Sequence, residues 1–253
     1  MDRSIYAVWY DLSEEDKSGY LAWLHDDYFP NLLERPGYLW AAHYEITGGG
    51  SGMNKLTSGL ERLSGPEIGS GTNFVAIIGA ESPHVFFNPL IFQSDNPLAN
   101  RHHDTGDQAV QKMLAKRAGA RQGVYTEQER VEGPEIGQRP VGTCPGPAIQ
   151  FGSFLTKTIQ DEYDLAAWYA QYRFPAIAKM PGSIGARKMV AVAGPVKHCI
   201  LYEYTSLEAR LKNFEEHETL GLNDGEWTHR IVNYTIHSPG SPSVGRRIWP
   251  EVE

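Results

Sequence analysis

The sequence has little that would bind a polyanion, hold a disulfide framework or cross a membrane. Its 253 residues carry a formal net charge of −8, so no basic surface for nucleic acid is expected. Two cysteines, Cys144 and Cys199, are too few for a disulfide framework and indicate a reducing compartment. No apolar run approaches the roughly 20 residues of a membrane span, and the first residues do not resemble a signal peptide. We therefore expect a cytoplasmic protein that binds neither nucleic acid nor membrane.

Motifs for nucleotide cofactors and metals are also missing. The sequence contains no G-x-G-x-x-G after an expected strand, no phosphate-binding G-x-x-x-x-G-K loop, no G-x-S-x-G and no C-x-x-C. The histidine-rich stretch 101–104, even with His84 nearby, lacks the spacing of a metal site. We expect no metal and no tightly bound organic cofactor. Either His102 or His103 enters a substrate pocket, with His103 as the candidate contact, or Asp104 caps the helix that follows.

The sequence does contain an internal repeat. Trp23–Gly37 (WLHDDYFPNLLERPG) recurs 145 residues later as Trp168–Gly182 (WYAQYRFPAIAKMPG). Chance similarity between two amphipathic helices would not keep the capping residue, both prolines and the strand aromatics in register, so we interpret the repeat as a tandem duplication. Residues that both copies share are expected to be scaffold, and residues that differ are candidates for function. The aligned pairs outside the repeat are Ser13 with Thr158, Tyr6 with Phe151 and Trp9 with Phe154.

Hydrophobic periodicity predicts the same order of elements in each half. A Ser or Thr is expected to cap each long helix, and Pro30 to kink its helix or shift the last turns. In the first half we expect strands at 4–12, 38–47, 74–80 and 122–131 and helices at 13–34 and 104–117. In the second half we expect strands at 149–157, 183–193, 198–205 and 227–237, helices at 158–180 and 206–220, and a tail at 238–253 that packs across the other half.

Each half is therefore β-α-β-β-α-β, the ferredoxin-like order. The pattern Trp-x5-Phe-Pro followed by a Pro-Gly turn into a strand, LLERPGYLWAAHY, resembles the dimeric α+β barrel superfamily, with its EthD-like and antibiotic-biosynthesis-monooxygenase-like members. The resemblance covers both halves and implies an α+β fold in which two ferredoxin-like units form one pseudo-symmetric barrel. We expect the units at 1–133 and 148–253, joined by a linker at 134–147. It also implies a ligand pocket between the sheet and its covering helices.

The resemblance leaves the reaction open. The superfamily includes isomerases, cyclases, decarboxylases, cofactor-free oxygenases and haem enzymes, and fold analogy does not choose among them. By that analogy a haem would be held by His198 or His217, although no local pattern supports either histidine. We rank a haem site below a cofactor-free site.

Two insertions distinguish the first half from the second. The loop at 48–71 and the connection at 82–105 are longer than their counterparts. They are either surface elaborations or dimer contacts, or a lid over a pocket with Gly48–Gly52 as its flexible stem. We favour the lid, because the aromatic residues Phe86, Phe87 and Phe92 need an apolar partner and are candidates to contact substrate.

At matched positions the first half has imidazole and aromatic groups where the second has small or cationic ones. A histidine with a tyrosine can abstract and return a proton near neutral pH. His25 and His43 are therefore candidate acid/base residues, with Tyr28 assisting, although a single histidine of this kind is more often structural. The matched pairs are His25 with Ala170, Tyr28 with Arg173 and His43 with Lys188.

Further residues are candidates for substrate binding. Trp40 and Tyr44 are expected to line the pocket, although strand alternation places them on the face opposite His43. Arg173 and Arg187 would hold a carboxylate or phenolate, or else pair with acids on the surface.

The sequence therefore predicts a cofactor-independent enzyme that transfers protons on an aromatic or polycyclic small molecule, as a lyase, isomerase or cyclase. The alternatives are a haem-dependent or oxygen-using enzyme and a non-catalytic ligand-binding or assembly module. A homodimer is a further expectation, because exposed barrel edges and helices often pair.

Overall fold

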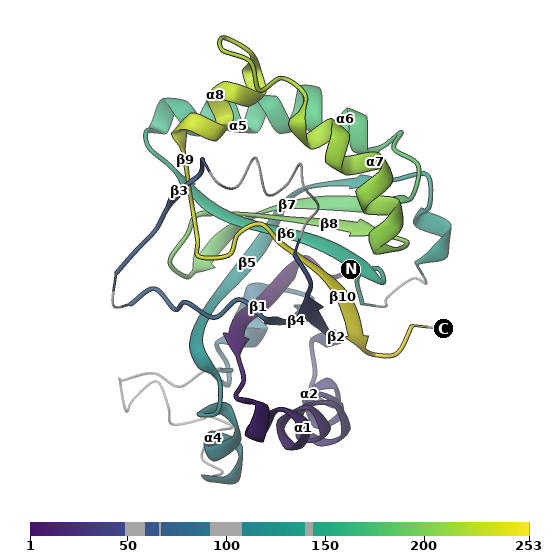
Figure 1. Ribbon diagram of the computed structural model, residues 1–253. Helices are drawn as coiled ribbons and strands as arrows, with labels where there is room; N and C mark the ends of the chain where they lie inside the picture. Colours follow the sequence, from purple (N-terminus) through teal and green to yellow (C-terminus); the bar gives the residue numbers. More distant parts are fainter. Residues whose placement is uncertain (49–58, 66, 92–107, 140–143, 253) are drawn as a thin grey trace.

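Eight strands in the described part of the chain close into a barrel to which both halves contribute (Figure 1). The computed structural model describes residues 1–253 except 49–58, 66, 92–107, 140–143 and 253. The strands of the first half are β1 (Ser4–Asp11), β2 (Tyr38–Ile46), β4 (Phe74–Ala80) and β5 (Ala118–Glu132). Those of the second half are β6 (Ala148–Thr156), β7 (Ser183–Ala193), β8 (His198–Tyr204) and β10 (Ser243–Trp249). This architecture confirms the predicted α+β barrel of two β-α-β-β-α-β units.

The last strand of each half pairs with one strand of its own half and with one strand of the other half. β5 pairs with β1 and with β7, and β10 pairs with β6 and with β2, in each case antiparallel. The order around the barrel is β2-β4-β1-β5-β7-β8-β6-β10, and it returns to β2. Because of these pairings, each of the eight strands has a hydrogen-bonded neighbour on both sides. The unit boundaries at 133 and 148 remain a prediction.

Helices cover the two opposite outer faces of the barrel (Figure 1). Within the described residues, no helix is both long enough and apolar enough to span a membrane. The first half carries α1 (Glu14–Ala22), η1 (Trp23–Tyr28), α2 (Phe29–Leu33), η2 (Pro83–Phe86) and α4 (Gln108–Leu114). The second half carries α5 (Ile159–Trp168), η6 (Tyr169–Arg173), α6 (Phe174–Ile177), α7 (Leu207–Thr219) and α8 (Trp227–Tyr234). A short helix η5 (Ile136–Gln138) follows β5.

Both long helices widen into a π turn directly before a Phe-Pro pair. The N–H of Phe29 donates to the carbonyl of Leu24, and the N–H of Phe174 donates to the carbonyl of Tyr169, five residues back in each case. The proline that follows lacks an N–H and cannot continue the ordinary ladder. The predicted shift of the last helical turns at Pro30 is thus confirmed, and the second half has the same feature before Pro175. π turns of this kind are frequent at functional sites.

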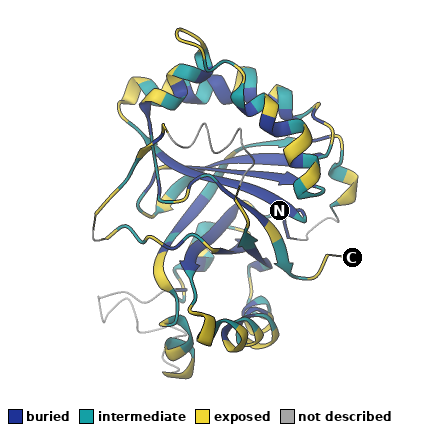
Figure 2. Cartoon of the chain, viewed as in Figure 1, coloured by how far each residue is buried: buried dark blue, intermediate teal, exposed yellow. Residues whose placement is uncertain are grey.

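The core has three layers, and the strands separate them (Figure 2). The barrel interior holds side chains of both halves, and one further layer lies under the helices of each half. Tyr6 lies under the first-half helices, whereas its aligned residue Phe151 lies in the barrel interior. Trp9 and Phe154 are exchanged in the same way. The gap-free alignment therefore fails in the first strand of each half, because a shift of one residue reverses the face.

Four expectations about the elements need correction. Residues 227–237, expected as a strand, form α8 and the short strand β9 (Thr235–His237). The expected tail contains β10, which is the fourth strand of the second half and does pair with β2 of the first. The first insertion carries β3 (Glu61–Arg62), which pairs in parallel with β9. The helix expected at 104–117 is α4 in its described part, and β5 begins at Ala118 rather than at 122.

The turn after each long helix depends on a glycine, which allows a test of the scaffold. Gly37 has φ +87°, and an added Cβ would lie 2.6 Å from Cγ2 of Val85. We expect Gly37→Ala to lower the free energy of unfolding by more than about 1 kcal/mol, because the backbone conformation and the contact are both unfavourable for alanine. Urea denaturation measures this change.

The control is Gly19→Ala within α1, where an added Cβ has no atom within 4 Å. This variant should be stabilised by roughly 0.5–1 kcal/mol, because alanine favours helix more than glycine. Equal stability of Gly37→Ala and the unaltered protein would show that the turn does not constrain the fold.

Candidate functional site

The two predicted histidines lie side by side in the first half. Nε2 of His25, on the π turn η1, is 2.8 Å from Nδ1 of His43, on β2. Nε2 of His43 is in turn 2.8 Å from the hydroxyl of Tyr10, on β1. The structure thus brings the predicted pair together and adds Tyr10, which the sequence analysis did not single out. Tyr28 lies apart from this chain of hydrogen bonds, with its ring centroid 4.9 Å from that of Trp23.

Burial keeps both imidazoles uncharged near neutral pH. The pKa of His43 lies well below its ordinary value because of burial first, and then because of the nearby His25 and Arg117. Burial also lowers the pKa of His25, against the opposing effect of Asp26. A neutral imidazole has one donor and one acceptor nitrogen, and a phenol can both donate and accept. The hydrogen bonds of this array can therefore run in either direction, so it can pass a proton between Tyr10 and His25.

Aromatic side chains fill the space between the first-half sheet and its helices. The ring of His25 stacks on Phe29 and on Trp249 of β10, with centroids 6.3 and 5.9 Å apart. The guanidinium of Arg117 lies 4.9 Å from the ring of Tyr10, and its Nε donates to the hydroxyl of Tyr20 at 2.5 Å. This layer is packed as a core.

A cavity lies in the corresponding layer of the second half. It lies between strands β6 and β8 and the helices α5, η6, α7 and α8. Leu60 of the first-half insertion, next to β3, also lines it, so the insertion does reach a pocket, but that pocket belongs to the other half. The lining residues are Leu60, Gln150, Gly152, Phe154, Trp168, Tyr169, Arg173, Ile200, Tyr202, Glu218, Thr228, Ile231, Val232, Thr235, His237 and Pro242.

Arg173 is the buried cation of this cavity. Its side chain comes from the π turn η6, and the residue is 5% exposed. The guanidinium lies 4.6 Å from the ring of Trp168 and 5.2 Å from that of Phe214, which hold it by cation–π contact. Its Nε and Nη1 have no hydrogen-bond partner among the described residues. A buried guanidinium without such partners is costly unless a ligand satisfies it.

Glu218, which lines the cavity together with Arg173, already accepts hydrogen bonds from other residues. Glu218 accepts from Nε2 of Gln150 at 2.6 Å and from Nη2 of Arg210 at 2.9 Å. Burial raises the pKa of Glu218, against the opposing effects of Arg210 and Arg173. Two donors therefore orient Glu218, and its pKa lies above that of an ordinary glutamate.

The other predicted substrate-binding residues fall in three places. Trp40 and Tyr44 face the barrel interior, on the opposite side of β2 from His43, so the expectation that they share a pocket with the histidines is not met. Phe86 is buried under the first-half helices, and Phe87 is half-buried beside it. Phe92 and His103 lie outside the described residues.

Arg187 is not free to bind a substrate in the second-half cavity. It is buried in the barrel, where Nη1 lies 2.8 Å from Asp2 and Nη2 lies 3.1 Å from Glu203. The two arginines that the sequence analysis grouped together thus have different surroundings, and only Arg173 lines the cavity.

A haem held by histidine does not fit the second-half cavity. Neither His198 nor His217 is among its lining residues, and the histidine that does line it is His237. Both ring nitrogens of His237 are within hydrogen-bonding distance of hydroxyls, at 3.2 Å from Thr235 and 3.4 Å from Ser241. Iron ligation would require His237 to leave these partners.

Comparison with known proteins supports the fold. No protein-family profile matches the sequence, and no curated protein matches it either. Among solved structures, an anthrone oxidase-like protein is 9% identical with a TM-score of 0.52, over 98% of this chain and 92% of its own. A proposed monooxygenase from Lactobacillus acidophilus is 11% identical with a TM-score of 0.51, over 97% and 94%. A proposed chlorite dismutase is 11% identical with a TM-score of 0.51, over 98% and 96%. The chain therefore has the dimeric α+β barrel fold, with both units in one polypeptide.

The buried histidine pair predicts a loss of stability in acid. The folded pKa of His43 lies below its ordinary value of about 6.5, so the unfolded chain takes up the proton first as pH falls. The stabilisation is fully present above about pH 6.5 and declines below it, by up to about 1.4 kcal/mol per pH unit for one histidine. We expect His43→Gln to flatten this decline, as measured by urea denaturation between neutral and mildly acidic pH.

The matched control is His229→Gln, on the surface of α8, where the side chain is 30% exposed. This variant should keep the pH dependence of the unaltered protein. If His43→Gln keeps the same pH dependence as the unaltered protein, protonation of His43 does not cause the loss of stability in acid.

Proposed function

We propose that this chain is an enzyme that binds an aromatic small molecule with one anionic oxygen group in the second-half cavity and transfers a proton on it. The observation that carries the proposal is the buried guanidinium of Arg173, which lines the cavity with two nitrogens lacking a partner. A carboxylate or phenolate in the cavity would accept a hydrogen bond from this guanidinium and supply a counter-charge.

The remaining lining suits the body of such a molecule. Trp168, Phe154 and Ile231 offer apolar and aromatic walls, as is usual for small-molecule sites. Leu60 would cover the ligand from the side of the first-half insertion.

Glu218 is the proton-transferring group that we propose for this cavity. Its raised pKa brings it closer to the pH at which a general acid or base is most effective. His237 is the weaker base, because burial and the nearby Arg62 lower its pKa to about 3. Proton transfer without a tightly bound organic cofactor corresponds to a lyase, isomerase or cyclase reaction. The proposed partner is a small molecule, and a homodimer remains a prediction.

An oxygen-consuming reaction on the same bound anion is the alternative. It is favoured by the names of two solved proteins of this fold, an anthrone oxidase-like protein and a proposed monooxygenase. Oxygen uptake during turnover would distinguish it from proton transfer. A pocket that binds the anion without product formation would identify a binding module instead.

The binding test compares 2-naphthoate with its neutral analogue 2-naphthamide. We expect the unaltered protein to bind the anion more tightly, and Arg173→Met to weaken its binding at least about tenfold, because the only unpaired guanidinium found lining the described cavity is lost. Isothermal titration calorimetry measures both affinities.

The control is Arg230→Met, on the outer face of α8, where the arginine side chain is 63% exposed. It should bind 2-naphthoate as the unaltered protein does. Equal affinity of Arg173→Met and Arg230→Met for the anion would overturn the proposed anchor.

The His25–His43–Tyr10 array supports a second candidate site for acid/base chemistry. Its hydrogen bonds, both 2.8 Å, connect a half-buried imidazole to a fully buried phenol. For a substrate found by screening aromatic acids and phenols, we expect His25→Ala or His43→Ala to lower kcat at least about tenfold if this array carries the reaction.

Glu218→Gln separates the two candidate sites. Loss of turnover in this variant, with normal rates in both histidine variants, places the reaction in the second half. Normal turnover in Glu218→Gln, with loss in the histidine variants, assigns it to the array. The variant His229→Ala serves as the histidine control.

A further inference from the structure

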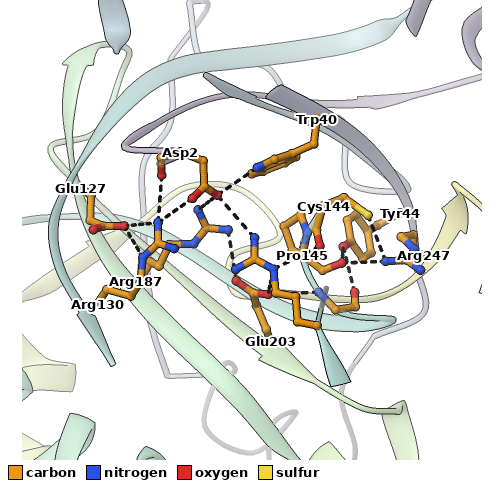
Figure 3. Close-up of polar contacts among 12 residues, drawn as sticks. Asp2, Trp40, Tyr44, Glu127, Arg130, Cys144, Pro145, Arg187, Glu203 and Arg247 are labelled. Carbon is orange, nitrogen blue, oxygen red and sulfur yellow. Dashed lines mark hydrogen bonds and ion pairs between the residues drawn. The ribbon is translucent and has the colours of Figure 1, made fainter. Parts of the chain in front are cut away.

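A cluster of arginines lies where β1 begins and β5 ends, around the carboxylate of Asp2 (Figure 3). Arg130 comes from β5, Arg187 from β7, and Arg139 from the segment that follows η5. Their guanidinium groups meet around the carboxylate of Asp2, which lies two residues before β1. Four segments of the chain thus converge on one anionic group.

Asp2 is held as a protein would hold a bound carboxylate. Its Oδ1 accepts from Nη2 of Arg130 at 3.0 Å. Its Oδ2 accepts from Nη1 of Arg187 at 2.8 Å, from Nε1 of Trp40 at 2.9 Å and from Nη2 of Arg139 at 3.4 Å. Burial alone would raise the pKa of Asp2, but Arg187, Arg130 and Arg139 together hold it far below its usual range. The carboxylate is therefore charged at neutral pH and saturated by donors.

Without Asp2 the buried Arg187 would lose one of its two acidic partners among the described residues. Glu203 contacts Arg187 at 3.1 Å and Arg139 at 3.4 Å, and Glu127 contacts Arg130 at 2.6 Å. Arg187 would then share its remaining acidic partner, Glu203, with Arg139. Because Arg187 is almost fully buried, the missing anion would have to be replaced or the arginine would remain under-compensated.

A small cavity adjoins the cluster. Its walls are partly apolar. A short hydrocarbon chain attached to a carboxylate would contact these walls beside the guanidinium groups. The lining residues are Arg130, Val131, Glu132, Ile136, Arg139, Ile184, Gly185, Ala186, Arg187 and Glu203.

Asp2 is the member of the cluster whose movement disturbs the least structure. The pairing of β1 with β4 and β5 begins at Ser4. Before Ser4 the backbone accepts two further hydrogen bonds, at Arg3 from the N–H of Glu127 at 2.8 Å and at Asp2 from Nη2 of Arg130 at 2.9 Å. The arginines, Trp40 and Glu203 are by contrast fixed by strands or by the segment between units. The aspartate can therefore leave while the donors stay in place.

We propose that this arginine cluster is a binding site for a small aliphatic monocarboxylate, and that Asp2 occupies the site in cis and competes with the ligand. The ligand's carboxylate takes the place of the Asp2 carboxylate, and its hydrocarbon chain enters the adjoining cavity. The exchange conserves the charge of the cluster, so no proton needs to be gained or lost.

The test uses the full chain with Asp2→Ala and propionate as the probe. We expect Asp2→Ala to bind propionate at least about tenfold more tightly than the unaltered protein by isothermal titration calorimetry. Propionate should also raise the melting temperature of the variant, because it binds the folded state, whereas chloride at equal ionic strength should not. If Asp2→Ala does not fold without ligand, refolding in propionate but not in chloride supports the proposal, and Asp2→Asn supplies the calorimetric comparison.

Two controls separate this site from general effects of salt and from the second-half cavity. Glu45→Ala removes a surface partner of Arg246, whose side chain is 62% exposed, and propionate should not stabilise that variant more than chloride does. Adding Arg173→Met to Asp2→Ala should leave propionate binding unchanged, so failure here is distinguishable from failure of the proposed aromatic site. Equal propionate affinity of Asp2→Ala and the unaltered protein, or equal stabilisation of Glu45→Ala, would show that Asp2 is a fixed part of an ion network and no occupant of a site.

Discussion

Each half ends in a strand that also pairs with the other half, and the rest of the structure depends on this constraint. A sheet of eight strands closes only if its last strands find partners, and here β5 and β10 each find one in the other half. Closure creates a shared interior and two outer faces that must be covered. The helices that cover these faces carry the π turns, and the π turns position His25 in the first half and Arg173 in the second.

The two outer layers solve the same covering problem with different side chains. Under the first-half helices, tyrosines gather around Arg117 and leave a packed layer. Under the second-half helices, the position aligned with Tyr28 is Arg173, whose guanidinium borders a cavity. An arginine near a cavity needs an anion, whereas an arginine surrounded by phenols is already satisfied. The difference between the halves that matters for ligand binding is therefore the state of these two arginines.

Local chemistry made much of the scaffold predictable from the sequence. The caps at Ser13 and Thr158, the Phe-Pro pairs and the Pro-Gly turns act through neighbouring backbone groups, and the structure has them as expected. Alternation along β2 likewise placed His43 on the face opposite Trp40. Residues 227–237 were mistaken for a strand because their β-branched and aromatic residues favour strands locally, while the helix α8 is stabilised by packing over the second-half sheet. Leu60 and Tyr10 depend on contacts between distant segments, which spacing does not reveal.

Leu60 lines the second-half cavity, so residues of both units shape that pocket. A ligand in that cavity would touch residues of both units, since β3 of the first lies against β9 of the second. Separate expression of either unit would open one wall of the pocket as well as the barrel. Because each half has its own sequence, a single chain of this design can keep a cavity in one half and fill the corresponding layer of the other.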